Sequence, residues 1–274
     1  MKRIVTIQDI SCLGKCSLTV ALPIISAMGV ETAIIPTAVL STHTMFKNFT
    51  CCDLDDQIVP ITDHWKKEEI KFDGIYTGYL ASEKQIDTVI SVIEKLSDET
   101  LVIVDPAMAD NGKMYPAFDT NFPKGMARLC GKADIILPNI TEACFMTDTE
   151  YKTEYDESYI KGLIEKLANL GSKKVVLKGV NLNGEFGVWT YDCETKEYKV
   201  YNHEKIDVAY HGTGDIFASV FTGAIMREKT IEEAVKIAAD YVVECIKVTM
   251  SSENPIWYGV EFESVIPSLV DKIR

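Results

Sequence analysis

The sequence predicts an α/β fold in which helices cover both faces of a mostly parallel sheet. Short runs rich in β-branched residues alternate with stretches of helical apolar spacing along most of the 274 residues, and such alternation is typical of parallel sheets. The chain is also long enough, with 47% hydrophobic residues, for one large domain with a substantial core. No repeat, linker or low-complexity segment interrupts the pattern, so we expect a single domain over residues 1–274.

The expected elements follow one another in a regular order. Strands are expected at residues 3–8, 33–39, 74–78, 101–105, 134–137 and 174–178. Helical apolar spacing predicts helices at 17–28, 86–96, 121–130 and 159–170. Pro23 should kink the first of these helices or shift its start. The last third of the chain adds a hairpin, 186–191 and 197–201, and two helices at 216–226 and 231–249.

Charge and hydropathy exclude several classes of partner. A formal net charge of −13 disfavours nucleic acid, which would need a basic stripe, and the pair Lys66-Lys67 is followed at once by Glu68-Glu69. No apolar run reaches the roughly 18 residues of a membrane span, and residues 1–7 are typical of a strand rather than of a signal peptide. We therefore expect a cytoplasmic protein with small-molecule partners and neither nucleic acid nor membrane.

The chain has eight cysteines and four histidines. No two cysteines form a Cys-x-x-Cys pair and no histidine has ligand spacing to a cysteine, so neither zinc nor a disulfide framework is expected. We expect reduced thiols, several of them buried, with Cys51 and Cys52 in a loop or in the core.

The most informative motif is Gly212, Thr213, Gly214 and Asp215. It lies between the hairpin and the apolar helix at 216–226, which puts consecutive main-chain amides and a carboxylate at a helix N-terminus. Such amides attract phosphate, aided by the helix dipole, and the carboxylate can accept a proton from an attacking hydroxyl. Phosphoryl transfer to a small alcohol needs both parts. The alternative is a glycine turn whose acidic residue only complements the dipole.

Polar or small residues stand at the ends of five expected strands: Gln8-Asp9, Thr77-Gly78-Tyr79, Asp105-Pro106, Pro138-Asn139 and Lys178-Gly179. Asp105 closes the apolar run 101–104, and Asn139 and Glu142 follow the strand at 134–137. Ligands of open parallel sheets bind beyond the C-terminal strand ends, where carboxylates can hold Mg²⁺ near phosphate oxygens. A turn residue at Asp105 and a helix that begins near Glu142 are the alternatives for the single residues.

Residues 13–17 resemble a P-loop only in part. The P-loop pattern needs Gly at position 9 and Ser or Thr at position 16, where Asp9 and Cys16 stand. Gly14 instead supplies a turn that passes close to a ligand or enters the first helix, and a phosphate-binding role is not expected for Lys15.

His43 lies between two threonines, just past a strand end. It can contact a polar or aromatic ligand, or it can be a loop histidine with local hydrogen bonds. Nearby aromatic and apolar side chains are expected in the core: Met45, Phe46, Trp65 and Tyr79.

Taken together, these motifs resemble the pyridoxal/pyridoxamine kinases of the ribokinase-like superfamily. The matching motifs are distributed along nearly the whole chain: Ile7-Gln8 with Gly14, Ser41-Thr42-His43-Thr44, Thr77-Gly78-Tyr79-Leu80, Asp105-Pro106-Ala107-Met108, Pro138-Asn139 with Glu142, and Gly212-Thr213-Gly214-Asp215. The resemblance implies a ribokinase-like three-layer α/β/α sandwich with a mostly parallel central sheet. It also implies transfer of the ATP γ-phosphate to the 5′-hydroxymethyl of pyridoxal, pyridoxamine or pyridoxine.

The resemblance further implies a role for each matching residue. Asp215 would be the general base, and the amides of Gly212, Thr213 and Gly214 would form the anion hole. Mg²⁺ and the triphosphate would be held, mostly through water, by Asp105, Asn139 and Glu142, and the nucleotide would meet Lys178 and Gly179. The vitamin pocket would be lined by Asp9, His43, Thr44 and Tyr79, with Tyr115 in a flap. Such enzymes are usually homodimers, often assisted by a monovalent cation such as K⁺.

One position departs from the family pattern. Most of these kinases have Ser where Asp9 stands, and a carboxylate only accepts hydrogen bonds, so it can pair with a protonated pyridine nitrogen, with the amine of pyridoxamine, or with a different heterocycle. The nearest alternative is a hydroxymethylpyrimidine kinase of thiamine synthesis, although residues 9–15 lack the glycine-rich motif that those enzymes usually have in the first strand–helix loop. The non-enzyme alternative is a ligand-binding protein that retained the fold, which the intact Gly-Thr-Gly-Asp motif disfavours.

Overall fold

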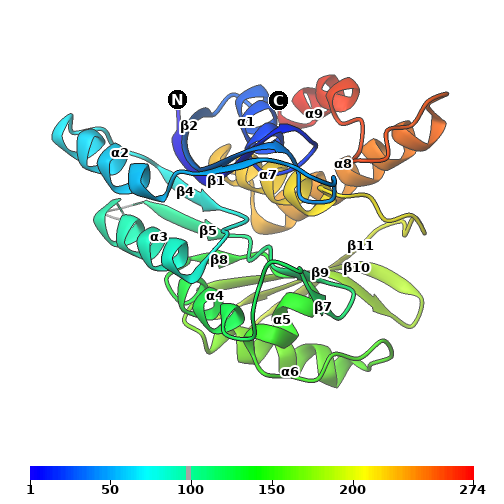
Figure 1. Cartoon of the computed structure of the whole chain (residues 1–274). Helices are drawn as coiled ribbons and strands as arrows, with labels where there is room; N and C mark the ends of the chain where they lie inside the picture. The colour runs from blue at the N-terminus through cyan, green and yellow to red at the C-terminus, as the bar shows by residue number, and fades with distance from the viewer. Residues whose placement is uncertain (97–99) are drawn as a thin grey trace. The chain divides into compact units, whose positions relative to one another are not determined.

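The computed structural model describes residues 1–96 and 100–274, which divide into two compact units (Figure 1). Unit 1 comprises residues 1–76 and 204–274, and unit 2 comprises residues 77–203. The predicted fold class is confirmed, because the chain has an α/β fold with a large, mostly parallel sheet. The single domain expected from the sequence stays a prediction.

The sheet of unit 1 is built around two long parallel strands, β1 (Arg3–Leu13) and β2 (Glu31–Thr42). The short strand β3 (Cys51–Asp53) pairs antiparallel with β2, and β4 (Gly74–Thr77), whose last residue opens unit 2, lies next to β1. Both long strands run past the limits 3–8 and 33–39 predicted from apolar residues. Their pairing continues beyond a register shift between Gln8 and Ile10 into polar residues.

The helices of unit 1 come from both ends of the chain. They are α1 (Leu18–Ala27), α2 (Asp55–Lys67), α7 (Thr213–Met226), α8 (Ile231–Ser251), the 3₁₀ turn η1 (Glu263–Val265) and α9 (Ile266–Ile273). In Figure 1 the blue α1 and the red α9 are neighbours, and α1 also contacts α7. The predicted helices 17–28, 216–226 and 231–249 are confirmed, and Pro23 lies inside α1.

Two expectations for this region are wrong, and one helix was missed. Helix α2 was not predicted, because only Ile58 and Thr62 are buried on it and its apolar stripe is correspondingly thin. Cys51 and Cys52 are neither loop nor core residues; they are exposed on β3. Met45 is 58% exposed rather than buried.

Unit 2 contains a second run of strands in the order β11-β10-β9-β8-β5. The strands β5 (Leu101–Val104), β8 (Ile135–Ile136) and β9 (Lys174–Leu182) are parallel, whereas β10 (Glu185–Asp192) and β11 (Tyr198–Asn202) form the predicted antiparallel hairpin. Its helices are α3 (Glu83–Leu96), α4 (Phe122–Cys130), α5 (Ile140–Met146) and α6 (Glu157–Ala168). A two-stranded ribbon, β6 (Ala109–Asp110) with β7 (Lys113–Met114), precedes α4.

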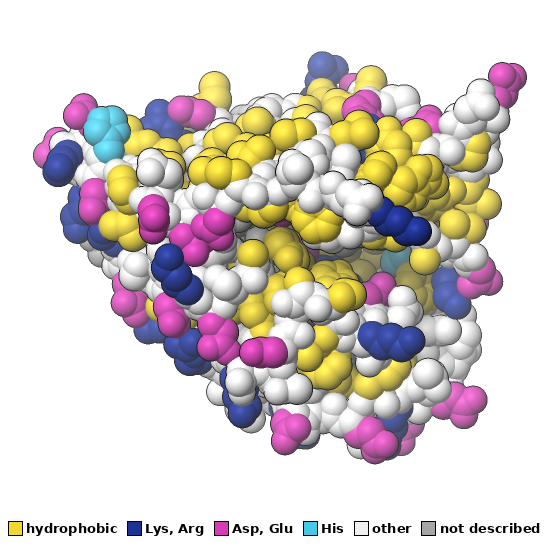
Figure 2. Space-filling model, viewed as in Figure 1, with side chains coloured by type: hydrophobic (Ala, Val, Ile, Leu, Met, Phe, Trp, Pro, Cys, Tyr) yellow, Lys and Arg dark blue, Asp and Glu magenta, His cyan; other side chains and the backbone are white. Residues whose placement is uncertain are grey.

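The surface and the thiols agree with the composition. On the face shown in Figure 2, Lys and Arg side chains are dispersed among Asp and Glu. All eight cysteines are free, and Cys16, Cys130, Cys144 and Cys245 are buried. Within residues 1–96 and 100–274, no helix has the length and apolar character needed to cross a bilayer.

Candidate active site

The Gly-Thr-Gly-Asp motif forms the N-terminus of α7 in unit 1. Gly212 is the N-cap, in the left-handed conformation with φ 81°, and Asp215 lies in the first helical turn. A Cβ at Gly212 would overlap the carbonyl oxygen of Lys15, so only glycine fits this turn. First-turn amides lack partners within the helix. The turn therefore presents main-chain donors together with a carboxylate, as phosphoryl transfer requires.

Asp9 lies on β1, beside the register shift between Gln8 and Ile10. The residue is 5% exposed, and its Oδ2 accepts a hydrogen bond of 3.1 Å from the Ser11 hydroxyl. Burial raises the pKa of Asp9, and hydrogen bonds from Ser17 and Ser11 oppose that rise. A bulge of this kind re-aims a side chain, and hydroxyl groups here hold a buried carboxylate.

Two imidazoles lie beside the motif. The centroids of the His43 and His211 rings are 4.4 Å apart. His43 accepts a hydrogen bond at Nδ1 from the Met45 amide and donates from Nε2 to the Tyr258 carbonyl, at 3.3 Å and 3.0 Å. Burial lowers the pKa of His43, and it lowers the pKa of His211 to about 4. Both rings are therefore neutral near pH 7.

Both ring nitrogens of His43 are thus engaged in hydrogen bonds within the protein, as the loop-histidine alternative predicted. The ring itself lies beside that of His211. Thr44, the next residue, is exposed.

Cys16 connects these groups within unit 1. The negative charges of Asp215 and Asp9 both act on its thiol, whose pKa is raised chiefly by burial and then by these carboxylates. The structure thereby brings Asp9, His43 and the Gly-Thr-Gly-Asp motif into one neighbourhood. His211, Cys16 and Ser17 also belong to it, and sequence reasoning did not select them. The position of His211 directly before Gly212 was the available signal.

Unit 2 holds a buried ionic cluster at the ends of β5 and β8. The Lys178 ammonium lies 2.8 Å from Oδ1 of Asp105, with the side chains 14% and 3% exposed. Burial raises the pKa of Asp105, and Lys178 opposes the rise. Lys178 was expected at a strand end, but β9 continues to Leu182. The parallel pairing of Lys178 with Asn139 ends at this position. Gly179, the next residue, has φ 73°.

Asn139 and Glu142 form a capping box at the start of α5. The Glu142 amide donates to Asn139 Oδ1 at 2.9 Å, and the Asn139 amide donates to Glu142 Oε2 at 2.7 Å. Glu142 also accepts from the Met108 amide at 3.4 Å. Burial raises the pKa of Glu142, and the neighbouring Asp105 adds to the rise against the lowering effect of Lys178. The helix alternative for Glu142 is thus correct, and it coexists with proximity to Asp105.

The fit of this cluster to Mg²⁺ rests on its charge. Two buried carboxyl groups share one ammonium, and burial raises the pKa of Glu142 to about 8. A further cation nearby would therefore favour the ionised form of these groups. The described residues contain no group of three or more His, Cys, Asp or Glu that could hold a metal ion. Coordination by Asp105 and Glu142 alone would leave most ligand positions to water or phosphate, which suits Mg²⁺.

Tyr79 and Tyr115 lie in an aromatic row of unit 2. The ring centroid of Phe118 is 5.5 Å from that of Tyr79 and 6.3 Å from that of Tyr115. Both tyrosines are half-buried. Tyr115 follows β7 directly, and its amide bonds to the Met108 carbonyl, so it flanks the β6–β7 ribbon, where a flap was expected.

The sequence profile of the phosphomethylpyrimidine kinase family matches residues 21–256. The chain belongs to this family. It therefore is a kinase of the pyridoxal and hydroxymethylpyrimidine kinase group, and membership implies ATP and a small-molecule substrate.

The named relatives include both pyridoxal kinases and hydroxymethylpyrimidine kinases. The chain is 26% identical to pyridoxal kinase of Dictyostelium discoideum, over 88% of this chain and 86% of that protein. It is also 26% identical to hydroxymethylpyrimidine/phosphomethylpyrimidine kinase of Aquifex aeolicus, over 70% of this chain and 76% of that protein.

Solved structures confirm the fold. A Bacteroides thetaiotaomicron protein, described as a candidate phosphomethylpyrimidine kinase, superposes with a TM-score of 0.94 at 35% identity, covering 98% of this chain and 93% of that chain. Another crystal form of that protein contains pyridoxal. Pyridoxal kinase of Lactobacillus plantarum superposes with a TM-score of 0.90 at 26% identity, over 99% of this chain and 97% of that chain.

Proposed function

We propose that this protein is a B6 vitamer kinase, which transfers the γ-phosphate of ATP to the 5′-hydroxymethyl of pyridoxal, pyridoxamine or pyridoxine. The observation that carries the proposal is the turn at the start of α7, where Gly212 lies in the left-handed conformation and Asp215 lies in the first turn. Amides of Gly212, Thr213 and Gly214 bind the transferring phosphoryl group, and Asp215 accepts the hydroxyl proton.

The substrate assignment rests on the surroundings of Asp9. A buried carboxylate held by hydroxyl groups favours a ligand with an N–H donor or a positive charge, such as a pyridinium or the amine of pyridoxamine. The neutral rings of His43 and His211 suit a flat heterocycle. Thr44 of unit 1 and Tyr79 of unit 2 are each assigned to substrate binding as well. The pyridoxal-containing crystal form of the relative at 35% identity supports the same substrate class.

Nucleotide binding is assigned to Lys178, Gly179, Asp105, Asn139 and Glu142 of unit 2. Mg²⁺, when bound, neutralises charge on the phosphates. Asp105 and Glu142 would hold it through water, Asn139 keeps Glu142 in place, and Tyr115 is assigned to a flap in the same unit. The proposal also includes K⁺ as an assisting cation, a homodimer and a location in the cytoplasm.

A hydroxymethylpyrimidine kinase is the second candidate, because the family profile and the Aquifex relative favour it. An aminopyrimidine also offers N–H donors to Asp9. The two candidates differ only in the acceptor, so a direct comparison of acceptors separates them.

The test is an ATP-consumption screen with purified protein over pyridoxal, pyridoxamine, pyridoxine and hydroxymethylpyrimidine, with product identified by mass. We expect the highest kcat/KM for a B6 vitamer. A higher kcat/KM for hydroxymethylpyrimidine would transfer the assignment to the second candidate. Tight binding without turnover of any acceptor would favour a ligand-binding protein.

A further inference from the structure

The loop of residues 14–17 in unit 1 is enclosed by main chain from two distant segments. A Cβ on Gly212 would overlap the carbonyl oxygen of Lys15, and a Cβ on Gly259 would overlap the Cβ of Lys15. Lys15 therefore lies directly between the turn that opens α7 and residues 259–263 near the C-terminus. Glycine at both positions allows this close approach.

The Lys15 side chain is used inside the protein. Its ammonium forms an ion pair with the carboxylate of Glu263, and it lies 5.1 Å from the ring centroid of the buried Phe262. The side chain of Lys15 is only 17% exposed, whereas that of Glu263 is 53% exposed. The lysine that gives this loop its partial likeness to a P-loop is therefore engaged by the C-terminal segment.

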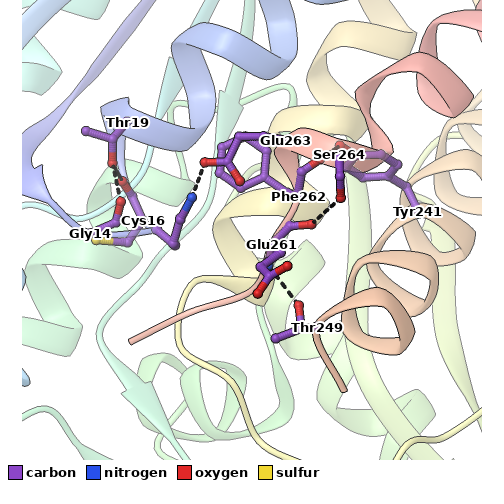
Figure 3. A network of polar contacts seen from close by, with 10 residues as sticks. Gly14, Cys16, Thr19, Tyr241, Thr249, Glu261, Phe262, Glu263 and Ser264 are labelled. Atoms are coloured by element: carbon purple, nitrogen blue, oxygen red, sulfur yellow. Dashed lines mark hydrogen bonds and ion pairs between the residues drawn. The ribbon is translucent and has the colours of Figure 1, made fainter. Parts of the chain in front are cut away.

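Both sides of this contact are anchored (Figure 3). The Tyr241 hydroxyl donates to the Phe262 carbonyl at 2.8 Å, and the Glu261 amide donates to the Thr249 hydroxyl at 2.8 Å. These bonds fix residues 261–262 to α8. On the loop side, the Thr19 hydroxyl donates to the carbonyl of Cys16 at 2.7 Å and to that of Gly14 at 3.3 Å.

The same loop reaches the candidate catalytic groups. The Ser17 hydroxyl acts on the carboxylate of Asp9 and lowers its pKa against the effect of burial, and Cys16 lies within the electrostatic reach of both Asp9 and Asp215. A shift of residues 14–17 would therefore move two groups together: the Lys15 carbonyl that lies against Gly212, and the Ser17 hydroxyl that acts on Asp9.

We propose that Lys15 is a positioning residue for phosphoryl transfer. Its ion pair with Glu263 and its contact with Phe262 hold its own carbonyl against Gly212, and so hold the amides of the anion hole in place. This inference rests on the proposed kinase function. A donor displaced by about 1 Å costs about 100-fold in rate, so the effect belongs in kcat rather than in ground-state binding.

The experiment replaces Lys15 by Met, which keeps the length of the side chain and removes the charge. We expect kcat to fall about 30-fold, which is less than the cost of about 100-fold for a full 1 Å displacement, while KM for ATP stays within about twofold. Lys15→Arg should restore most of the rate. Lys272→Met, which removes an ion pair of 2.8 Å to Glu244, is the matched control and should leave kcat unchanged.

Two further measurements keep the test decisive. Glu263→Gln alters the more exposed partner, so it replaces Lys15→Met if the latter does not fold. Hydrogen exchange of residues 211–216 should be at least about tenfold faster in either variant than in Lys272→Met. An active wild type whose Lys15→Met variant keeps its kcat overturns the inference. A wild type inactive on every acceptor contradicts the kinase proposal instead, and unchanged exchange at 211–216 then overturns the positioning role as well.

Discussion

The two units hold their buried carboxylates in different ways. In unit 1, Asp9 accepts a hydrogen bond from the Ser11 hydroxyl and lies near the neutral imidazole of His43, in the same neighbourhood as the turn of main-chain amides. In unit 2, Asp105 is paired with the ammonium of Lys178 and lies next to Glu142. Hydrogen bonds orient a group and leave its charge available, whereas an ion pair compensates charge at the cost of dehydrating both partners. The first arrangement suits a carboxylate that binds an N–H donor of the substrate, and the second suits binding of a metal-bound polyphosphate.

The largest expected effect separates chemistry from binding in unit 1. Asp215→Asn removes the proton acceptor but keeps the shape of the side chain, so kcat should fall about 10⁴-fold, which is the upper range for general-base catalysis. ATP affinity, measured by calorimetry, should change less than about threefold.

The control is Asp207→Asn, because Asp207 is 84% exposed at its side chain and pairs with Lys205. A kcat for Asp215→Asn within about tenfold of wild type would refute the general-base role.

The next effect tests whether charge holds the site of unit 2. Lys178→Met leaves Asp105 buried without its cation, and loss of one member of a buried pair costs about 3–5 kcal/mol of unfolding free energy. Addition of Asp105→Asn should recover part of this loss, because the neutral amide is less costly to bury. Urea unfolding measures both variants. If Lys178→Met alone were as stable as the wild type, the ion pair would not be needed to compensate the charge of Asp105.

A smaller effect comes from the neutral imidazole of unit 1. The pKa of His211 is lowered from its ordinary value of 6.5 to about 4, so the unfolded chain binds the proton first as pH falls. Unfolding free energy should therefore decrease below about pH 6.5 and level off below about pH 4. At 1.36 kcal/mol per unit, the loss is on the order of 3 kcal/mol.

His211→Gln should remove this loss when unfolding is measured at pH 7 and pH 4.5, whereas His64→Gln, at an exposed position, should not. Equal acid sensitivity in wild type and His211→Gln would mean that other groups cause the whole decline.

The smallest effect sharpens the role of Asp9. Asp9→Ser exchanges a carboxylate for a neutral hydroxyl, so the ratio of kcat/KM for pyridoxamine to that for pyridoxine should fall about tenfold, equivalent to about 1.4 kcal/mol. Steady-state assays at pH 7 measure the ratio. An unaltered ranking of the vitamers would remove Asp9 from the substrate pocket.

The sequence predicted the features that depend on local periodicity. The parallel strands, the final hairpin and helices such as α8 follow from apolar spacing, and the turn at Gly212 follows from a motif with one steric solution. Helix α2 was not predicted because few of its residues are buried, so its apolar periodicity is weak. The available signal was charge: Asp55 and Asp56 at its start and Lys66 and Lys67 at its end complement the helix dipole.

Features that depend on long-range contact could not be predicted in this way. The pairing of Lys15 with Glu263 spans most of the chain, and no local pattern links the two. The low pKa of His211 comes from burial, which is set by packing rather than by neighbours in sequence. For the same reason Lys178 was taken as a strand end, since its buried partner Asp105 directly follows another strand, β5.

One side chain in unit 2 serves two neighbours at once. Asn139 accepts the Glu142 amide at Oδ1 and donates from Nδ2 to the Ala109 carbonyl at 2.8 Å. Deamidation of Asn139 would therefore keep the helix cap, while a carboxylate oxygen would face the Ala109 carbonyl and repel it. Replacement of one NH₂ group by oxygen would loosen the β6–β7 ribbon and leave α5 intact, which makes chemical ageing at this residue a selective lesion.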